Sequence, residues 1–200
     1  MTFDLPIVLQ RVAAAGHRVF TTGRYNVNIV GVRNPDSKPD QFDDRLHVVY
    51  LDDFNQWCDL SFRCTTDPGL HYLLHPINKA GTAILKPGQY RSAYRIGLHR
   101  GSYPALVQAG PVTVYRDRNR DTIHDMDSAT LETGHFGVNI HHAGDDSTVV
   151  SRWSAGCTVV ANRLDWEIFL TIIHKSASLY GDRFTYTLIE GNHAGKTQIS

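Results

Sequence analysis

The sequence has few cysteines, no net charge and no long hydrophobic run, and each shortage excludes a class of protein. Three cysteines leave at least one thiol without a disulfide partner in the same chain. Twenty basic and twenty acidic residues balance, and neither sign is collected in a long run, so we expect no nucleic-acid partner. No apolar stretch approaches the roughly 20 residues that cross a bilayer, so no membrane span is expected.

A signal peptide, internal repeats and low-complexity segments are also missing. The N-terminus has no basic region followed by an apolar core and a cleavage site. We therefore expect a leaderless protein. The 200 residues, of which 42% are hydrophobic, are enough for one good core, so residues 1–200 are expected to form a single domain.

Two helices are expected, one near each end of the chain. Residues 2–15 have a helical pattern that stops at Gly16. Residues 163–180 form a stronger helix, with Asn162 as its N-cap and Gly181 at its end. We divide the chain into an N-terminal helical segment, a catalytic core and a loose tail, at residues 1–16, 17–190 and 191–200.

Between these helices the pattern is that of β-strands. Six segments are rich in β-branched residues or alternate between polar and apolar: 45–52, 55–62, 111–116, 135–142, 157–161 and 183–189. Turn residues separate them, and residues 33–40 form a polar loop. The fold class is therefore mainly β with flanking helices (α+β), either a β-sandwich or a partly closed barrel.

The three cysteines differ in their surroundings. Cys58 and Cys64 lie in an alternating segment, where six residues of extended chain place their Cα atoms about 20 Å apart, too far for a disulfide. Cys157 instead follows Ser154, Ala155 and Gly156, three small residues that fit a tight turn. A thiol on such a turn can meet a base and nearby backbone N–H groups, which is the arrangement of a cysteine nucleophile and its oxyanion site.

Strand alternation selects the base. In residues 135–142, the positions of Phe136, Val138, Ile140 and His142 share an apolar face, and those of Gly137, Asn139 and His141 share a polar one. His141 is therefore expected to meet the substrate, and His142 to pack or cap. A cysteine followed by Thr-Val-Val is equally typical of a buried core strand, so spacing alone leaves both readings open.

A resemblance favours the catalytic reading. The order "GVNIHHAG", "SRWSAGC", "TVVANRLDWEIF" resembles the L,D-transpeptidase (YkuD-like) catalytic domain, in particular phage and prophage members with Trp-Ser-Ala-Gly-Cys. It is tight over residues 135–168 and diffuse over 45–115. It implies Cys157 as nucleophile, His141 as base, Ser154 as the hydroxyl before the cysteine, and Gly156 as the oxyanion-turn glycine. We assign substrate binding to Asn139, His142, Trp153, Arg91 and Tyr103.

The sequence also departs from that family's pattern. Ala155 stands where many members have a second histidine, and the basic residue that usually follows the cysteine is missing. Only twelve residues separate His141 from Ser154, which implies a shortened hairpin. These departures indicate a divergent branch but leave the Cys–His pair in place.

The resemblance implies acyl transfer on peptidoglycan stem peptides, with no required cofactor. The thioester formed on the cysteine would pass to water, which cleaves, or to an amine, which cross-links. The leaderless chain favours a hydrolase, an L,D-carboxypeptidase or endopeptidase, that reaches the periplasm or cell wall by another route, such as phage lysis or injection. An L,D-transpeptidase is the first alternative.

Two further alternatives belong to other classes of protein. The eleven histidines allow a zinc amidase or peptidase, although no HExxH or CxxC motif occurs. A phage structural or wall-binding module that keeps the fold without activity is the non-enzymatic alternative.

An acidic segment resembles a calcium loop. Five residues occupy positions 1, 3, 5, 7 and 9 of the ligand pattern: Asp117, Asn119, Asp121, Ile123 and Asp125. Thr122 replaces the turn glycine and Ser128 replaces the bidentate glutamate. A solvated acidic turn, relieved by neighbouring arginines, is the preferred interpretation, and a structural calcium ion is the alternative.

Overall fold

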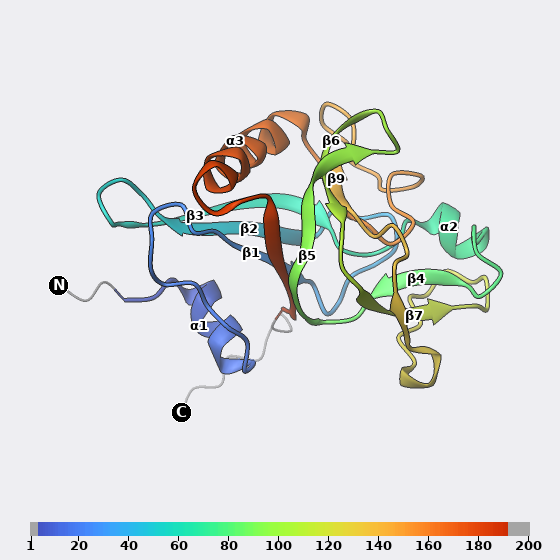
Figure 1. Ribbon diagram of the computed structural model, residues 1–200. Coiled ribbons are helices and arrows are strands. Elements are labelled where there is room, and N and C mark those ends of the chain that lie inside the picture. Colours follow the sequence, from blue (N-terminus) through green and yellow to red (C-terminus); the bar gives the residue numbers. More distant parts are fainter. Residues whose placement is uncertain (1–3, 192–200) are drawn as a thin grey trace.

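An eight-stranded closed barrel forms the centre of the structure (Figure 1). In the computed structural model, which describes residues 4–191, strands account for 38% of the chain and helices for 18%. The expected mainly β fold with a few helices is confirmed. The predictions were a sandwich or a partly closed barrel, and the barrel that forms is fully closed. Its strands, in spatial order, are β1 (Asn28–Arg33), β11 (Arg183–Glu190), β5 (Gly88–His99), β6 (Tyr103–Gln108), β9 (Ile140–His142), β10 (Thr158–Val160), β3 (Trp57–Thr65) and β2 (Asp44–Leu51).

A second, three-stranded sheet lies beside one end of the barrel. It contains β4 (Thr82–Leu85), β7 (Val112–Asp117) and β8 (Glu132–Gly134), in the order β4-β7-β8 (Figure 1). Two short helical segments, α2 (Leu70–Leu74) and the 3-10 helix η1 (Ser128–Thr130), belong to the connections. This sheet matters for the site because β4 supports the turn before Cys157.

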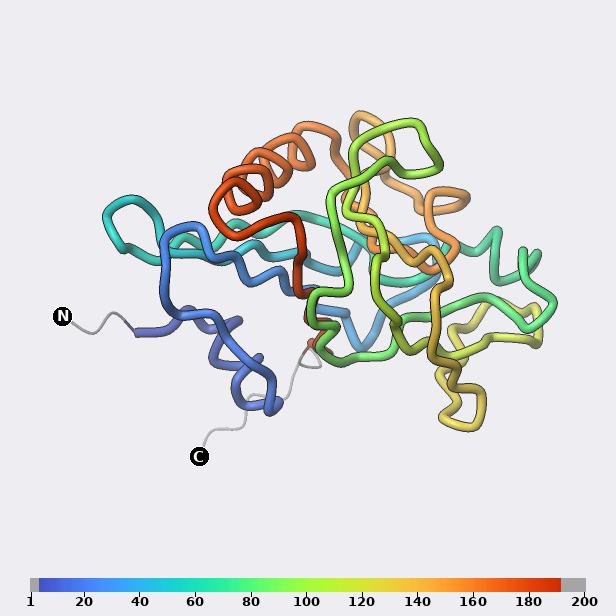
Figure 2. Tube along the Cα trace, in the orientation of Figure 1, coloured from blue at the N-terminus to red at the C-terminus, as the bar shows by residue number. Residues whose placement is uncertain are grey.

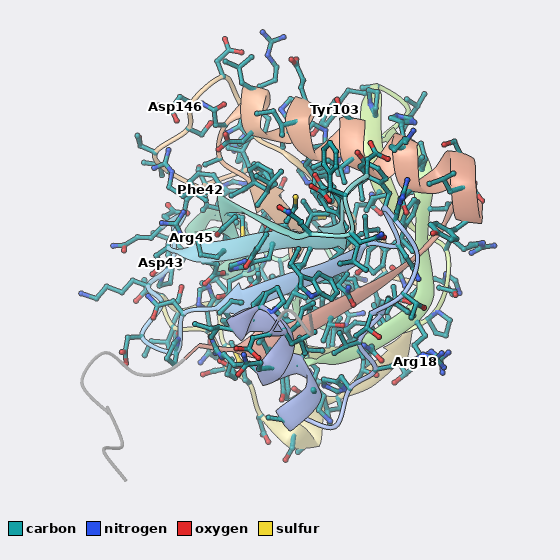
Figure 3. The ribbon with its side chains drawn as sticks, turned by 90° about the vertical axis from the view of Figure 1, so that its left-hand side faces the viewer. Arg18, Phe42, Asp43, Arg45, Tyr103 and Asp146 are labelled. Carbon is teal, nitrogen blue, oxygen red and sulfur yellow. The ribbon has the colours of Figure 1, made fainter. Side chains whose placement is uncertain are left out.

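The two long helices cover different parts of the barrel. α3 (Arg163–Tyr180) has the predicted bounds, and its Trp166 and Phe169 belong to the barrel core. α1 (Ile7–Ala14) packs its apolar side against β1, β2 and β11. Figure 3 shows α3 across the top of the strands and α1 below it in front. No helix in residues 4–191 is both long enough and apolar enough to cross a membrane.

The expected first helix was too long. Residues 2–15 were expected to be helical, but α1 begins at Ile7, after Pro6. Proline fits the start of a helix and disfavours helical backbone in the residue before it. The helix therefore cannot extend from Pro6 toward the N-terminus through Leu5. Residues 2 and 3, and the predicted tail beyond residue 191, lie outside the described residues.

One predicted strand is much shorter in the structure. Residues 135–142 were expected to be extended, but only Ile140–His142 join the ladder. Gly137 has φ +73°, and the Gln108 side-chain oxygen accepts from the backbone N–H groups of 136, 137 and 138. The backbone therefore bends around this amide instead of pairing with a neighbouring strand.

Cys58 and Cys64 both lie on β3, as the alternation predicted. They pair with Tyr50 and Asp44 of β2 over one continuous ladder, so the strand is extended between them. All three cysteines are free thiols.

Candidate active site

Cys157 lies immediately before β10, on the outer face of the barrel wall. Thr158 and Val160 point inward: Val160 belongs to the core, and Thr158 Oγ1 is 2.9 Å from the Tyr186 hydroxyl. The alternation of the strand then turns Cys157 and Val159 outward, where the segment from 143 to 150 and Phe42 cover them. Cys157 is 8% exposed.

The thiol is held by two backbone groups and is neutral at rest. Cys157 Sγ accepts from the Asn139 N–H at 3.4 Å and donates to the Gly137 carbonyl at 3.6 Å. Burial raises the pKa of Cys157 to about 11, although the Asn139 N–H and the charge of Arg100 oppose this shift. A base must therefore remove the proton during attack.

His141 lies on the adjacent strand and on the same face as Cys157. β9 runs parallel to β10, with Thr158 opposite Ile140 and Val159 opposite His141. Val138 and Ile140 point into the core, as the alternation predicted. Because paired residues of adjacent strands share a face, His141 and Cys157 are diagonal neighbours, within the reach of an aromatic side chain.

The hydrogen bonds of His141 leave one ring nitrogen free to accept a proton. Its Nδ1 is 2.9 Å from the His142 carbonyl and 3.0 Å from the Tyr103 hydroxyl. A carbonyl only accepts, so Nδ1 carries the proton and Nε2 has a free lone pair. Among the described residues, Nε2 is buried and without a hydrogen-bond partner. Burial, and next the charge of His99, lower the pKa of His141 to about 3, which keeps the ring neutral.

Sequence reasoning missed two residues that support this pair. The ring of His99 stacks on His141 with centroids 3.9 Å apart, and its Nδ1 is 3.2 Å from Asn139 Nδ2. Gln108 fixes the bend that presents the Gly137 carbonyl to the thiol. Neither residue stands in a local motif. The only signal was the "HRGS" turn, which indicates a hairpin after His99.

Ser154 and Gly156 shape the turn before the nucleophile. Ser154 is fully buried; its hydroxyl donates to the Cys157 carbonyl at 2.8 Å and accepts from the Gly156 N–H at 3.2 Å. Gly156 has φ +117°, and a Cβ there would lie 2.2 Å from the Ala83 carbonyl oxygen of β4. The two hydrogen bonds of Ser154 thus stabilise the turn. Glycine is needed at 156 because the backbone has a positive φ there and packs closely against β4.

This geometry corrects the expected oxyanion site. The N–H groups around Gly156 and Cys157 were expected to be open, but the Gly156 N–H is already bonded to Ser154. For the Cys157 N–H, no acceptor occurs within residues 4–191. The Cys157 N–H is therefore the donor that remains for a developing oxyanion.

Contacts with distant loops hold the turn in place. The Gly69 N–H donates to the Ser154 carbonyl at 2.9 Å. Asp40 Oδ1 accepts from the Leu70 N–H at 2.7 Å and from the Ser151 N–H at 2.8 Å. Asp40, at the end of the predicted polar loop 33–40, thus joins α2 to the turn.

Two cavities flank the turn. One, of about 260 Å³, is lined by His99, Arg100, Ser102, Tyr103, His141, Arg152 and Trp153. The other, of about 290 Å³, lies toward the second sheet, and its lining includes Ala83, Phe136 and Ala155. Residues of the hairpin around residue 100 and of the turn around 152, which can be followed by colour in Figure 2, both line the first cavity.

The predicted substrate-binding residues separate into three groups. Tyr103 and Trp153 line the first cavity, and Tyr103 also bonds His141. Asn139 and His142 belong to the framework: the Asn139 side chain contacts His99 and Gln108, and the His142 ring lies 4.7 Å from that of Tyr103. Arg91 lines a separate cavity, eight residues before His99 on β5, so the structure does not bring it to the site.

The acidic loop of residues 117–125 closes on itself. Asn119 Nδ2 donates to Asp121 Oδ2 at 2.8 Å and to Asp125 Oδ2 at 2.6 Å, and Asp117 Oδ2 accepts from the Asp125 N–H. The Ile123 N–H donates to Asp121. Over the part of the chain that the structure describes, no group of three or more His, Cys, Asp or Glu side chains is placed to hold a metal ion. The solvated acidic turn remains the preferred interpretation, and calcium binding at this loop remains the alternative.

Comparison with known proteins adds no assignment. No family model, curated protein or solved structure matches the chain.

Proposed function

We propose that the chain is a cysteine acyl-transfer enzyme that hydrolyses peptide bonds in peptidoglycan stem peptides. The observation that carries the proposal is the geometry of His141. Its proton is held on Nδ1 by a backbone carbonyl, and its buried Nε2 has no partner among the described residues, on the face that Cys157 occupies. A neutral imidazole on the same face of the sheet as a buried thiol, with one ring nitrogen free to accept a proton, is the pair that nucleophilic catalysis by cysteine uses.

The reaction would begin with two neutral groups. As Cys157 Sγ attacks the substrate carbonyl, its proton passes to His141 Nε2, and the His142 carbonyl and Tyr103 hydroxyl stabilise the imidazolium through Nδ1. The Cys157 N–H would donate to the oxyanion. Collapse of this intermediate breaks the C–N bond, and Nε2 returns the proton to the leaving amine. Water then attacks the thioester, releasing the acid and restoring the thiol.

The substrate class is supported by the resemblance of the Ile-His and Ser-Ala-Gly-Cys segments to L,D-transpeptidase catalytic domains. The scissile bond would join an L-configured centre to a D-amino acid. Such a substrate places the action in the periplasm or at the cell wall, which the protein would reach through phage lysis or injection.

Charge beside His141 favours water over an amine as acceptor. Both the leaving and the accepting amine must approach Nε2 of His141, a residue that lines the same cavity as Arg100 and Arg152. Two positive charges there disfavour an incoming ammonium group, whereas water is unaffected. We therefore propose a hydrolase in preference to a cross-linking transpeptidase.

Digestion of muropeptides of defined stem length, with products separated by mass, tests this function. We expect shortened stems from the native protein and none from Cys157→Ala. Cross-linked dimers with little shortened stem would identify a transpeptidase. Cleavage that survives Cys157→Ala but stops with a chelator would identify the zinc alternative, and no change in any muropeptide would contradict the substrate assignment.

A further inference from the structure

The cavity beside His141 holds two cationic side chains and no acidic one. Of its seven lining residues, Arg100 and Arg152 carry permanent positive charge, and none is Asp or Glu. Within residues 4–191, neither arginine has an ion-pair partner, whereas Arg33, Arg63, Arg116 and Arg163 each pair with a carboxylate. The two free guanidinium groups therefore face a cavity that suits an anion.

The two arginines come from separate parts of the chain. Arg100 is at the tip of the β5–β6 hairpin, with φ +49°, and Arg152 precedes Trp153 in the turn that leads to Cys157. Both line the same cavity, so two positive charges border one space. A planar guanidinium binds a carboxylate through two parallel N–H···O bonds, so two of them can hold a single carboxylate from both sides.

We propose that Arg100 and Arg152 bind the free terminal carboxylate of the amino acid that leaves, so that the enzyme removes a single C-terminal residue from the stem peptide. This inference rests on the proposed function. It names the enzyme a carboxypeptidase and assigns two specificity-determining residues to it.

The position of the base decides which part of the substrate enters this cavity. His141 Nε2 must protonate the leaving amine, so the residue that carries this amine lies on the histidine side. His141 lines the cationic cavity. The lining of the second cavity includes Phe136, Ala155 and Arg116, whose guanidinium is already paired with Glu132, so this cavity is left for the acyl side. A leaving residue with a free carboxylate can bind both guanidinium groups. A residue that continues into a cross-link or ends in an amide carries no negative charge at this position, so it lacks these contacts.

Peptide binding to the Cys157→Ala protein measures this recognition without turnover. The probes are a tetrapeptide stem with a free C-terminal D-amino acid and the same stem with a C-terminal amide, titrated by calorimetry. We expect the free acid to bind at least about tenfold more tightly. Arg100→Gln and Arg152→Gln, each in the Cys157→Ala background, should each remove about tenfold of the affinity for the acid and leave the amide unchanged.

Arg95→Gln is the matched control. Arg95 is an exposed arginine on β5 whose one side-chain hydrogen bond in the described chain goes to the neighbouring Ile96 carbonyl, and it does not line the cavity. Its change should leave both affinities as they were. Equal binding of acid and amide, equal losses in all three variants, or no binding of either peptide overturns the inference. The muropeptide digest decides the proposed function separately, because an enzyme that cleaves stems without this preference keeps that function and loses only the carboxylate site.

Discussion

Burial gives His141 and Cys157 opposite pKa shifts, and both shifts favour the neutral pair. The thiol, with a pKa of about 11, stays protonated, and the imidazole, with a pKa of about 3, stays unprotonated near neutral pH. The pair therefore rests as two neutral groups and not as an ion pair, so the proton has to move from the thiol to the imidazole during the attack. This division of roles makes the two adjacent histidines separable by mutation.

His141→Gln and His142→Gln form the first test. Loss of the base should lower kcat/KM by about 10²–10⁴-fold. His142 packs against Tyr103 and Trp166, so its replacement should lower Tm and change kcat/KM only a few-fold. Steady-state kinetics and thermal unfolding of both variants check this. A finding that His142 is the indispensable residue would contradict the assignment.

The depressed pKa of His141 also predicts how stability depends on pH. Below the unfolded value of about 6.5 the unfolded chain binds a proton that the folded protein excludes until about pH 3. Stability is thus fully present above about pH 6.5 and falls by about 1.4 kcal/mol per unit as pH drops toward 3. Denaturant unfolding at a series of pH values from 7 to 4 gives the unfolding free energy at each pH. This free energy should fall less steeply with decreasing pH for His141→Gln than for the native protein. Identical slopes would refute a buried neutral imidazole.

Among single residues, the sequence predicted those that lie close together in one local motif. Cys157, Ser154 and Gly156 stand in one turn, and alternation placed His141 on the correct face. It could not predict His99, Gln108 or Arg100, because their contacts depend on which strand lies beside β9. It also placed Arg91 at the site, and the path of β5 takes that residue elsewhere.

Among the elements, the turn before β10 is the most demanding in shape. Gly156→Ala adds a Cβ 2.2 Å from a backbone carbonyl at φ +117°, so we expect it to cost about 2–5 kcal/mol of unfolding free energy and most of the activity. Gly101→Ala is the control: it also has positive φ, +72°, but nothing lies within 4 Å, so about 1 kcal/mol is expected. Similar losses in both would show that φ alone, and not the contact with β4, makes glycine necessary.

The acidic loop of residues 117–125 allows a test of calcium binding. Asn119 Nδ2 lies between the carboxylates of Asp121 and Asp125, so its amide occupies the position where an ion would bridge them. We expect millimolar Ca²⁺ to leave Tm unchanged, and Asn119→Ala to lower it because the two carboxylates then repel each other. A Ca²⁺-dependent rise of several degrees in the native protein would instead establish the calcium site.

Elements with strong end signals were predictable, and elements shaped by distant partners were not. The Asn162 side chain caps the Leu164 and Asp165 N–H groups, so the bounds of α3 follow from the sequence. The bend in residues 136–138 was not predicted, because it depends on a hydrogen bond to Gln108 of another strand. β1, β4 and β6 were missed as well, since their apolar residues are adjacent and do not alternate, and β5 and β8 were also missed.

For the whole molecule, barrel closure assembles the site. β9 and β10 pair in parallel, which puts His141 beside the start of β10, and the β5–β6 hairpin adds His99, Arg100 and Tyr103 from a segment about 40 residues earlier. The strand patterns predicted a mainly β fold, and the length and composition predicted one core. Closure was not predictable, because it requires β1 to pair with β11, more than 150 residues later in the chain.

Intact-protein and peptide mass spectrometry after incubation with a carbapenem-like acyl donor measures the nucleophile directly. We predict one adduct per chain, on Cys157, absent from Cys157→Ala and strongly reduced in His141→Gln. Cys64 is fully buried with a raised pKa, and burial also raises the pKa of Cys58. Both lie on β3, which β10 separates from the strand of His141. Adducts spread over Cys58 and Cys64, or an unmodified Cys157, would contradict the cysteine mechanism.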